Sequence, residues 1–425
     1  MIKEPYCFSK DDIEKYAGLE NKVLSKSQKI KVGIPISLEK DIKIKEYKIN
    51  KLLGEGTYSF VWSVSKNNKN YAIKMTKPDN DEEKVTENEI SLLKKYNKSN
   101  YIISLHDTFY YKDNNKKYLC MVMDELGCDL HILKRMFKYK NSYYDTDSES
   151  NKSSDTEMND PIIAVPFKLA KKITLQILKG LDYIHSNNII HTDIKLDNIL
   201  IEKNILDIKN DNDVNIKICD FGTSHFTSDK SNFSVGTIDY SAPECILGLP
   251  YGKGIDVWAT GCILFEIVTG ICLFDYSRYY DDASDISSGF SSSSNDNEND
   301  KTQVESLLLC MMKRILDGFP SKIFKKGKYY ENYFDYKGRL RFFPNFLEDD
   351  TILNSLIDEF NYDKSYAIPF NNFLLKLLCI NPNNRKNVKS LYETFMGKVI
   401  NAFVDWFRGI FHTIYIFTNN VIVFG

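Results

Sequence analysis

Residues 190–200 constrain the fold of this chain more than any other stretch. They read Ile-His-Thr-Asp-Ile-Lys-Leu-Asp-Asn-Ile-Leu, which places Asp193, Lys195 and Asn198 close together. A carboxylate can accept a hydroxyl proton, an ammonium can neutralise phosphate, and an amide oxygen can hold a divalent cation. Phosphoryl transfer needs these functions in one place, because its catalysis is mostly positioning and charge neutralisation. The stretch therefore favours a phosphoryl-transfer site.

A glycine-containing β-hairpin is predicted for residues 51–64. Apolar residues alternate on both sides of Gly54 and Gly56, as in two strands joined by a glycine turn. Because glycine has no Cβ, backbone N–H groups in such a turn can approach phosphates closely. The alternative is a purely structural hairpin. The next predicted strand ends at Lys74, which makes this lysine a candidate phosphate ligand.

A second candidate for metal binding follows a short apolar strand. Residues 216–218 read Ile-Lys-Ile, and Asp220, Phe221 and Gly222 come soon after them. An aspartate that follows a buried strand and precedes a glycine is well placed to hold Mg²⁺ at phosphate groups. The sequence thus supplies a second acidic group for the same chemistry.

The order and content of these motifs resemble those of the eukaryotic Ser/Thr protein kinases. The stretch at 190–200 resembles the His-Arg-Asp…Asn loop of that family, with Thr192 in place of the usual arginine, and residues 71–74 resemble its Val-Ala-Ile-Lys strand. Residues 220–222 match Asp-Phe-Gly, and residues 242–244 match Ala-Pro-Glu. The resemblance covers about residues 46–396. It implies an α+β, bilobal fold with a small β-rich N-lobe and a larger, mostly helical C-lobe.

Further details are similar to the CMGC group and most nearly to its SR-protein kinase family. Ser59 is followed by Val61 and Trp62, and the central loop reads His-Thr-Asp. Residues 309–320 and 326–330 resemble the extra region of CMGC kinases. Ser241 departs from the CMGC pattern, which commonly has arginine before Ala-Pro-Glu, so a preference for arginine- or proline-directed sites stays open.

The resemblance implies that Lys74 binds the α- and β-phosphates of ATP. A helix is predicted for residues 82–96 from the spacing of its apolar residues. Glu89 on this helix is expected to hold Lys74 through an ion pair, and Glu87 is the competing assignment.

The family likeness also assigns the remaining catalytic and metal-binding groups. Asp193 is expected to orient the substrate hydroxyl and accept its proton, while Lys195 steadies the γ-phosphate. Thr237 is expected to hydrogen-bond both residues. Asn198 and Asp220 would hold Mg²⁺, which together with ATP is the implied cofactor.

The nucleotide site implied by the resemblance includes backbone and apolar groups. The hairpin turn would surround the phosphates, Met123 would be the gatekeeper, and the following hinge backbone would bind adenine. Apolar side chains would enclose the ring, although they can equally be plain core. The implied residues are Leu53, Gly54, Glu55, Gly56, Thr57, Tyr58, Ser59, Val61, Ala72, Lys74, Met123, Asp124, Leu126 and Leu200.

Three structural interactions are also implied. Glu244 and Arg385 are expected to form a buried ion pair. Asp256, near the start of an apolar helix that reaches residue 269, is expected to orient the backbone of the central loop. His191 and Phe221 are expected to stack inside the C-lobe.

Composition limits the setting of the protein. Its net charge of -2 lacks the basic excess typical of nucleic-acid binding, so no nucleic-acid partner is expected. Nine cysteines without paired short spacings favour a reduced, intracellular compartment, with the cytoplasm preferred and the nucleus as alternative. The charged N-terminus does not resemble a secretory signal. A monomeric kinase domain is expected.

The sequence also divides into a domain, extensions and inserts. Residues 1–45 read as an N-terminal extension, 46–125 as the N-lobe and 126–396 as the C-lobe. Polar, acidic, serine-rich stretches near 141–160 and 277–300 are expected to be disordered inserts. The apolar tail at 397–425 is expected to pack on the kinase or self-associate, with membrane association as the less favoured alternative.

The sequence thus predicts a protein kinase that transfers the γ-phosphate of ATP to Ser or Thr of protein substrates, including basic, Arg/Ser-rich ones. A catalytically silent, kinase-like scaffold is the alternative. A small-molecule kinase is disfavoured by Thr237 and the Ala-Pro-Glu segment, which would shape a peptide groove. Because Thr192 cannot pair with a phosphate as arginine does, activity is expected to be independent of activation-loop phosphorylation.

Overall fold

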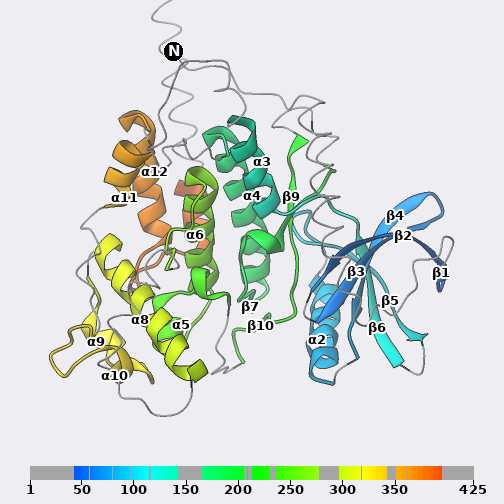
Figure 1. The fold of residues 1–425 in the computed structure, drawn as a ribbon, viewed down its shortest axis with the longest axis horizontal. Coiled ribbons are helices and arrows are strands. Elements are labelled where there is room, and N and C mark those ends of the chain that lie inside the picture. Colours follow the sequence, from blue (N-terminus) through cyan, green and yellow to red (C-terminus); the bar gives the residue numbers. More distant parts are fainter. Residues whose placement is uncertain are drawn as a thin grey trace, which may run out of the picture.

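The computed structural model describes most of the predicted domain. The described residues are 43–56, 58–78, 80–96, 98–113, 116–141, 165–204, 208, 213–229, 236–276, 296–316, 318–341, 351–360 and 362–394. The expectations for Thr57, for most of the extension at 1–45, for most of both inserts and for the tail at 397–425 lie outside these residues. Two lobes are visible side by side, with the sheet-rich lobe on the right of Figure 1.

The N-lobe is one antiparallel sheet with a helix on one face. Its strand order is β1-β2-β3-β4-β6-β5, and α2 (Asn80–Tyr96) covers the sheet on one side (Figure 1). The bounds are β1 (Lys43–Ile44), β2 (Tyr47–Glu55), β3 (Ser59–Lys66), β4 (Lys69–Thr76), β5 (Leu105–Asp113) and β6 (Lys116–Asp124).

The period-two alternation of side chains gives the sheet two apolar faces. Trp62, Ile73 and Val122 lie in a core of their own on the face away from α2. Met121 and Met123 lie on the opposite face, in the large core that also contains apolar residues of α2 and of the C-lobe. The side facing α2 and the C-lobe is therefore the side on which the functional groups gather.

The sheet begins earlier than the sequence indicated. β1 pairs with β2 through Ile44 opposite Tyr47, although residues up to 45 were predicted to precede the domain. Ile44 is fully buried, and Lys45 has a φ of 57° in the tight turn between the two strands. A two-residue strand carries no alternation that a sequence pattern can detect, so only its packing against the sheet reveals it.

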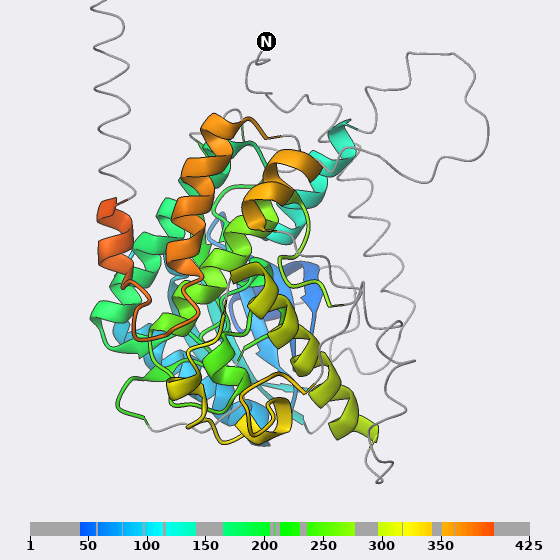
Figure 2. The ribbon, with the colours of Figure 1, turned by 90° about the vertical axis from the view of Figure 1, so that its left-hand side faces the viewer.

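The C-lobe is mostly helical and surrounds α6 (Gly254–Thr269), whose residues after Gly254 are all buried. Seen from the side, its helices lie in front of the N-lobe sheet (Figure 2). The other helices are α3 (Leu130–Asn141), α4 (Phe167–Ser186), α5 (Pro243–Ile246), α8 (Asp296–Leu316), α9 (Ser321–Phe324), α10 (Tyr330–Tyr333), α11 (Ile352–Asn354) and α12 (Lys364–Leu377).

Two short β-pairs and several short helical turns complete the lobe. β8 (Ile199–Ile201) pairs with β9 (Ile216–Ile218), and β7 (Ile189–Ile190) pairs with β10 (His225–Phe226). These pairs flank the loop that carries Asp193. The turns are η1 (Leu196–Asn198), η4 (Ile238–Tyr240) and a π-helical turn at Ser355–Glu359.

The predicted insert at 277–300 is too long at its C-terminal end. α8 already begins at Asp296, so the last residues of that stretch are helical. The N-terminus of a helix carries a partial positive charge, so an acidic stretch of sequence is compatible with the start of a helix. The composition that suggested disorder therefore does not exclude helix in this stretch. α3 extends to Asn141, the first residue of the other predicted insert.

No helix of the described residues is long and apolar enough to cross a membrane. The apolar tail at 397–425 is not among them, so its expected packing stays a prediction.

Candidate active site

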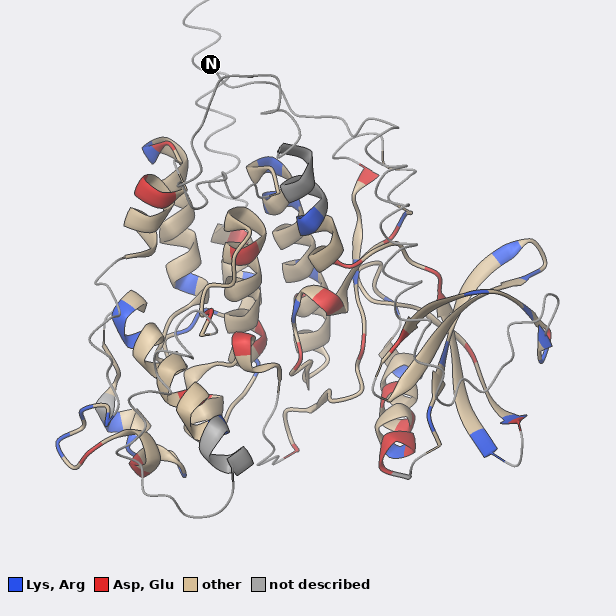
Figure 3. Ribbon diagram, in the orientation of Figure 1, with Lys and Arg blue, Asp and Glu red and all other residues tan. Residues whose placement is uncertain are grey.

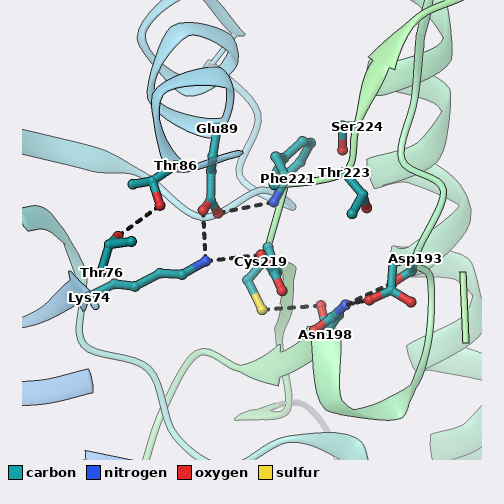
Figure 4. Close-up of polar contacts among 12 residues, drawn as sticks. Lys74, Thr76, Thr86, Glu89, Asp193, Asn198, Cys219, Phe221, Thr223 and Ser224 are labelled. Carbon is teal, nitrogen blue, oxygen red and sulfur yellow. Dashed lines mark hydrogen bonds and ion pairs between the residues drawn. The ribbon is translucent and has the colours of Figure 1, made fainter. Parts of the chain in front are cut away.

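Lys74 lies at the centre of a charged cluster between the lobes. Its Nζ donates to Glu89 Oε2 at 2.7 Å and to Asp220 Oδ1 at 3.0 Å. β4 positions the lysine and α2 the glutamate (Figure 4), and the aspartate follows β9. The ion pair expected of Glu89 is therefore formed, whereas Glu87 is exposed and points elsewhere.

Burial and charge together set the protonation of this cluster. Burial lowers the pKa of Lys74, but the carboxylates of Glu89 and Asp220 outweigh it and raise that pKa above its ordinary value. Burial likewise raises the pKa of Asp220, and the Lys74 ammonium outweighs it, so the pKa of Asp220 is lowered. Lys74 is thus cationic and Asp220 anionic near neutral pH.

Glu89 has a second partner. Its Oε1 accepts a hydrogen bond from the Phe221 N–H at 3.0 Å, and only 1% of the residue is exposed. One carboxylate therefore joins Lys74 of the N-lobe to the Asp-Phe-Gly segment of the C-lobe. The hydroxyls of Thr76 and Thr86, 2.8 Å apart and buried, add a link between β4 and α2.

Asn88, beside Glu89 on α2, makes a contact that the motifs did not indicate. Its Nδ2 donates to the Ser224 carbonyl at 2.8 Å and to the Gly222 carbonyl at 3.3 Å. α2 is therefore attached to the residues after Asp220 through an uncharged side chain. No motif could have identified Asn88, because its partners lie more than 130 residues away.

Asp193 is surrounded by the residues expected around it. Its Oδ1 accepts from the Thr237 hydroxyl at 3.0 Å, and its Oδ2 accepts from Asn198 Nδ2 at 3.0 Å and lies 2.8 Å from Lys195 Nζ. Lys195 also donates to Thr237 Oγ1 at 3.0 Å. Asp193 is thus held in one orientation from two segments, the central loop and the stretch before Ala-Pro-Glu.

Asp256 fixes the backbone of the central loop. The N–H groups of His191 and Thr192 each donate to its carboxylate at 2.9 Å, and His185 Nε2 lies 2.8 Å from Oδ2. Burial raises the pKa of Asp256, but the hydrogen bonds from His185 and from the His191 N–H help to lower it below its ordinary value. The expected anchoring by Asp256 is present, and His185 is an additional partner.

Thr192 forms uncharged contacts where an arginine is usual. Its Oγ1 lies 3.1 Å from the Thr223 carbonyl and 2.9 Å from Thr223 Oγ1. Its φ of 74° is left-handed, which is strained for a β-branched residue, so the loop geometry is imposed by its surroundings.

The rings of His191 and Phe221 are in contact, with their centroids 4.9 Å apart. They meet edge-on, however, and not in the expected parallel stack.

The glycine hairpin closes as a tight turn between β2 and β3. The Gly56 N–H donates to the Ser59 carbonyl at 2.9 Å, and Lys77 Nζ donates to the Gly56 carbonyl at 2.9 Å. A Cβ added at Gly54 would have no atom within 4 Å, so open space adjoins the turn. The turn therefore leaves room beside Gly54 for a bound phosphate group.

The predicted hinge lies at the end of β6. Met123 is buried on the α2 side of the sheet, and Ala72 is its partner on β4. Val61 is paired with Lys74, so Val61, Ala72 and Met123 share the side of the sheet on which Lys74 lies. Leu126 packs against the same core, and Leu200, in β8 of the C-lobe, is partly buried.

The Asp124 side chain adds an unpredicted anchor behind the hinge. Its carboxylate accepts from the Ser104 N–H at 3.2 Å and lies 2.7 Å from His106 Nε2 and 3.3 Å from Lys217 Nζ. On the other side of the hinge, Ser63 donates to Glu125 at 3.0 Å. These contacts hold the hinge backbone between the two lobes.

The residues present fit a magnesium ion bound together with phosphates. Asn198 uses Nδ2 for Asp193, which leaves its amide oxygen as a ligand, and 45% of the Asp220 side chain is exposed. The described residues contain no group of three or more His, Cys, Asp or Glu that could hold a metal ion. Mg²⁺ does not require one, because it usually takes one or two protein oxygens with phosphates and water.

Glu244 and Arg385 form the expected buried ion pair. The guanidinium binds the carboxylate through two contacts, of 2.6 Å and 3.0 Å, and both side chains are at most 1% exposed. Arg385 also donates to the carbonyls of Cys379 and Gly254 and lies over the Trp258 ring. The segment that ends in Ala-Pro-Glu is therefore fastened to the base of the C-lobe.

A two-lobed fold with these groups between the lobes defines a phosphotransferase of the protein kinase class. The chain belongs to the protein kinase family, since the model of the protein kinase domain matches residues 47–395. The predicted family and fold are thereby confirmed.

Similar proteins agree with this assignment. A "Serine/threonine-protein kinase SRPK" of Physarum polycephalum is 27% identical over 410 residues, which cover 83% of this chain and 86% of that protein. A "Probable dual specificity protein kinase YAK1 homolog" of Encephalitozoon cuniculi is 32% identical over 55% of this chain and 50% of that protein. A "Putative mitogen-activated protein kinase 14C" of Drosophila melanogaster is 35% identical over 55% of this chain and 58% of that protein.

The family and these relatives support serine/threonine protein kinase activity and CMGC-like character. The silent-scaffold alternative is not favoured.

Proposed function

We propose that this protein kinase transfers the γ-phosphate of ATP to Ser or Thr hydroxyls with Asp193 as the acceptor for the hydroxyl proton. One observation supports the proposal most directly. The side chains of Asp193, Thr237, Lys195 and Asn198 form one hydrogen-bonded group, and the ion pair between Lys74 and Glu89 is formed at the same time. Positioning and charge neutralisation are the main contributions that phosphoryl transfer requires of a protein.

The substrate hydroxyl would bind at Asp193, which is oriented by Thr237 and Asn198. The hydroxyl oxygen attacks the γ-phosphorus as the bond to the β–γ bridging oxygen breaks. The hydroxyl proton passes to Asp193, and ADP is the leaving group. Lys195 stabilises negative charge on the transferred group.

The nucleotide would be held from the opposite side. Lys74, kept in place by Glu89, binds the α- and β-phosphates, and the backbone amides of the glycine hairpin surround them. Asn198 and Asp220 are the residues that would hold Mg²⁺. When bound, the ion neutralises phosphate charge and aligns the phosphates for transfer.

The substrate class that we propose comes from the resemblance of this chain to one family within the CMGC group. The SR-protein kinase likeness supports basic, Arg/Ser-rich substrates as the proposal for this chain. The intracellular setting, the monomeric state and the absence of a nucleic-acid partner stay predictions.

The test is phosphate transfer from ATP with Mg²⁺ to an Arg-Ser repeat peptide and to an acidic serine peptide. Wild type, Asp193→Asn and Asp197→Asn would be compared. Asp197 is exposed in the same loop, so its variant is a matched control. We expect Asp193→Asn to lose about 10³-fold in rate while it still binds an ATP analogue, and Asp197→Asn to stay near wild type.

Faster transfer to the Arg-Ser peptide would support the substrate proposal. Transfer by Asp193→Asn at the wild-type rate would refute the assigned role of Asp193. ATP binding by wild type without transfer to either peptide, or to itself, would instead favour the scaffold alternative.

A further inference from the structure

The segment that follows α8 is strongly basic. Residues 321–341 contain seven basic and two acidic residues, a net formal charge of +5 in a chain whose total is -2. All seven basic residues are exposed. Figure 3 shows blue segments around α9 and α10, at the end of the C-lobe far from the N-lobe. We call this set the basic surface: Lys322, Lys325, Lys326, Lys328, Lys337, Arg339 and Arg341.

Buried aromatic residues explain why the charges face solvent. Phe324, Tyr333 and Phe334 are at most 3% exposed, and the Tyr333 hydroxyl donates to the Glu305 carboxylate of α8. The rings of Tyr330 and Phe334 are stacked with centroids 4.5 Å apart. Because these aromatic side chains fill the interior, the lysines between them are directed outward. The backbone that carries the basic surface is therefore held in place by buried aromatic residues.

Among the described residues, little of the positive charge of this surface is paired with carboxylates. Arg339 pairs with Asp335 at 2.8 Å. The five lysines form no ion pair with a carboxylate of the described residues. Lys328 and Lys337 lie over the rings of Tyr329 and Tyr336, at 4.9 Å and 5.4 Å from the ring centroids. Neighbouring like charges repel, and an anionic partner would relieve that repulsion.

The basic surface is joined to the segment beside Asp193. The Tyr329 N–H donates to the Leu247 carbonyl at 3.1 Å, and the Lys328 N–H donates to the Gly248 carbonyl at 3.4 Å. Leu247 directly follows α5, which begins at Pro243. The residues just before α5 line the small cavity that also includes Asp193 and Thr237. A substrate bound at the basic surface would thus contact a segment that is hydrogen-bonded to the residues after α5, close to the site of Asp193.

We propose that the basic surface docks an acidic segment of the protein substrate, separate from the residue that is phosphorylated. The proposal rests on the kinase function proposed above. Charge complementarity selects the occupant, because glutamate, aspartate or phosphoserine side chains match lysines that pair with no carboxylate of the described residues. An Arg/Ser-rich acceptor segment of the same substrate would bind apart from this surface, at Asp193. The surface adds affinity for the substrate by linking two contacts in one chain.

The experiment compares two peptides with the same serine acceptor sequence. One ends in a flexible Gly/Ser linker and a run of glutamates, and the other lacks the glutamates. KM and kcat would be measured for wild type, for Lys325→Glu/Lys326→Glu/Lys328→Glu, and for the matched control Lys364→Glu/Lys386→Glu/Lys389→Glu. The control residues are exposed lysines of the same lobe, so the net charge changes equally.

We expect the glutamate run to lower the wild-type KM roughly tenfold at low salt, because several weak exposed ion pairs act together. The triple variant of the basic surface should lose this gain, with kcat for the shorter peptide unchanged. The control variant should keep it. The gain should also shrink as salt is raised.

Fluorescence anisotropy of a labelled glutamate peptide separates docking from catalysis, because it needs no phosphate transfer. Binding that the triple variant loses and the control retains supports the basic surface even if neither acceptor peptide is phosphorylated. Equal KM values for both peptides with wild type, together with no anisotropy change, would overturn the proposal. Tighter binding of a single-stranded oligonucleotide than of the glutamate peptide would also overturn it.

Discussion

Thr192 shows how one substitution in a motif changes what the surrounding residues must do. An arginine at this position would have to be neutralised, and a phosphate on the activation segment is the usual partner. Thr192 instead contacts Thr223 through its hydroxyl, and its N–H binds Asp256. Ser224 adds a hydrogen bond to the His191 carbonyl at 3.1 Å. Neutral groups thus hold the start of the activation segment against the central loop.

We predict that the enzyme is active without phosphate on its activation segment. Treatment with a protein phosphatase should leave kcat/KM within about twofold of the untreated value, because the contacts of Thr192 involve no phosphate. The assay would use purified protein and a serine peptide, with mass spectrometry as the control for phosphate removal. A collapse in rate after dephosphorylation would show that the neutral contacts are insufficient.

At the scale of elements, α2 is the part that must be placed correctly against both lobes. Glu89 binds Lys74 of β4, and Asn88 binds the carbonyls of Gly222 and Ser224. These two adjacent side chains attach the helix to the N-lobe and to the segment after Asp220. Because α2 is attached to both lobes, it helps to keep Lys74 Nζ and Asp220 Oδ1 at a distance of 3.0 Å.

We predict that Asn88→Ala lowers kcat roughly tenfold. Two hydrogen bonds of about 1 kcal/mol each would be lost, which loosens α2 against the activation segment. Because Asn88 would not touch the nucleotide, KM for ATP should change by less than kcat. Faster amide exchange in residues 221–226 should accompany the loss. Glu87→Ala, at the exposed neighbouring position, is the control, and equal effects of both changes would argue against a positioning role for Asn88.

At the scale of the whole molecule, the Glu244–Arg385 pair connects segments that are 141 residues apart. It fastens the end of the activation segment to the stretch after α12, and Trp258 of α6 lies beneath the guanidinium. Such a pair is costly to bury, and it is costlier still to leave half of it unpaired. Its contribution is therefore to hold the substrate-binding side of the C-lobe in one arrangement.

We predict that Arg385→Met lowers the free energy of unfolding by roughly 3–5 kcal/mol, because Glu244 would stay buried without a partner. Thermal denaturation would show this as a lower melting temperature. In the double variant Glu244→Leu/Arg385→Met no charge is left buried, so much of the stability should return. A melting temperature that is unchanged by Arg385→Met would contradict the structural role of the pair.

The sequence by itself determined the fold class, the family and the identity of the main candidate residues. Lys74, Asp193 and Asp220 were recognisable because each stands in a short pattern next to a strand or a glycine, and such local patterns depend on neighbours in the chain. The apolar spacing of α2 also limited the partner of Lys74 to a few acids.

The tertiary structure alone decided the contacts that cross between segments. It separated Glu89 from Glu87, since only one of them faces Lys74, and it revealed Asn88, the anchor of Asp124 and the start of α8. It also placed β1 in the sheet and turned the His191–Phe221 contact edge-on. These features depend on packing between residues far apart in the chain. No local pattern records such packing, because burial, direction and distance are fixed only once the segments have folded together.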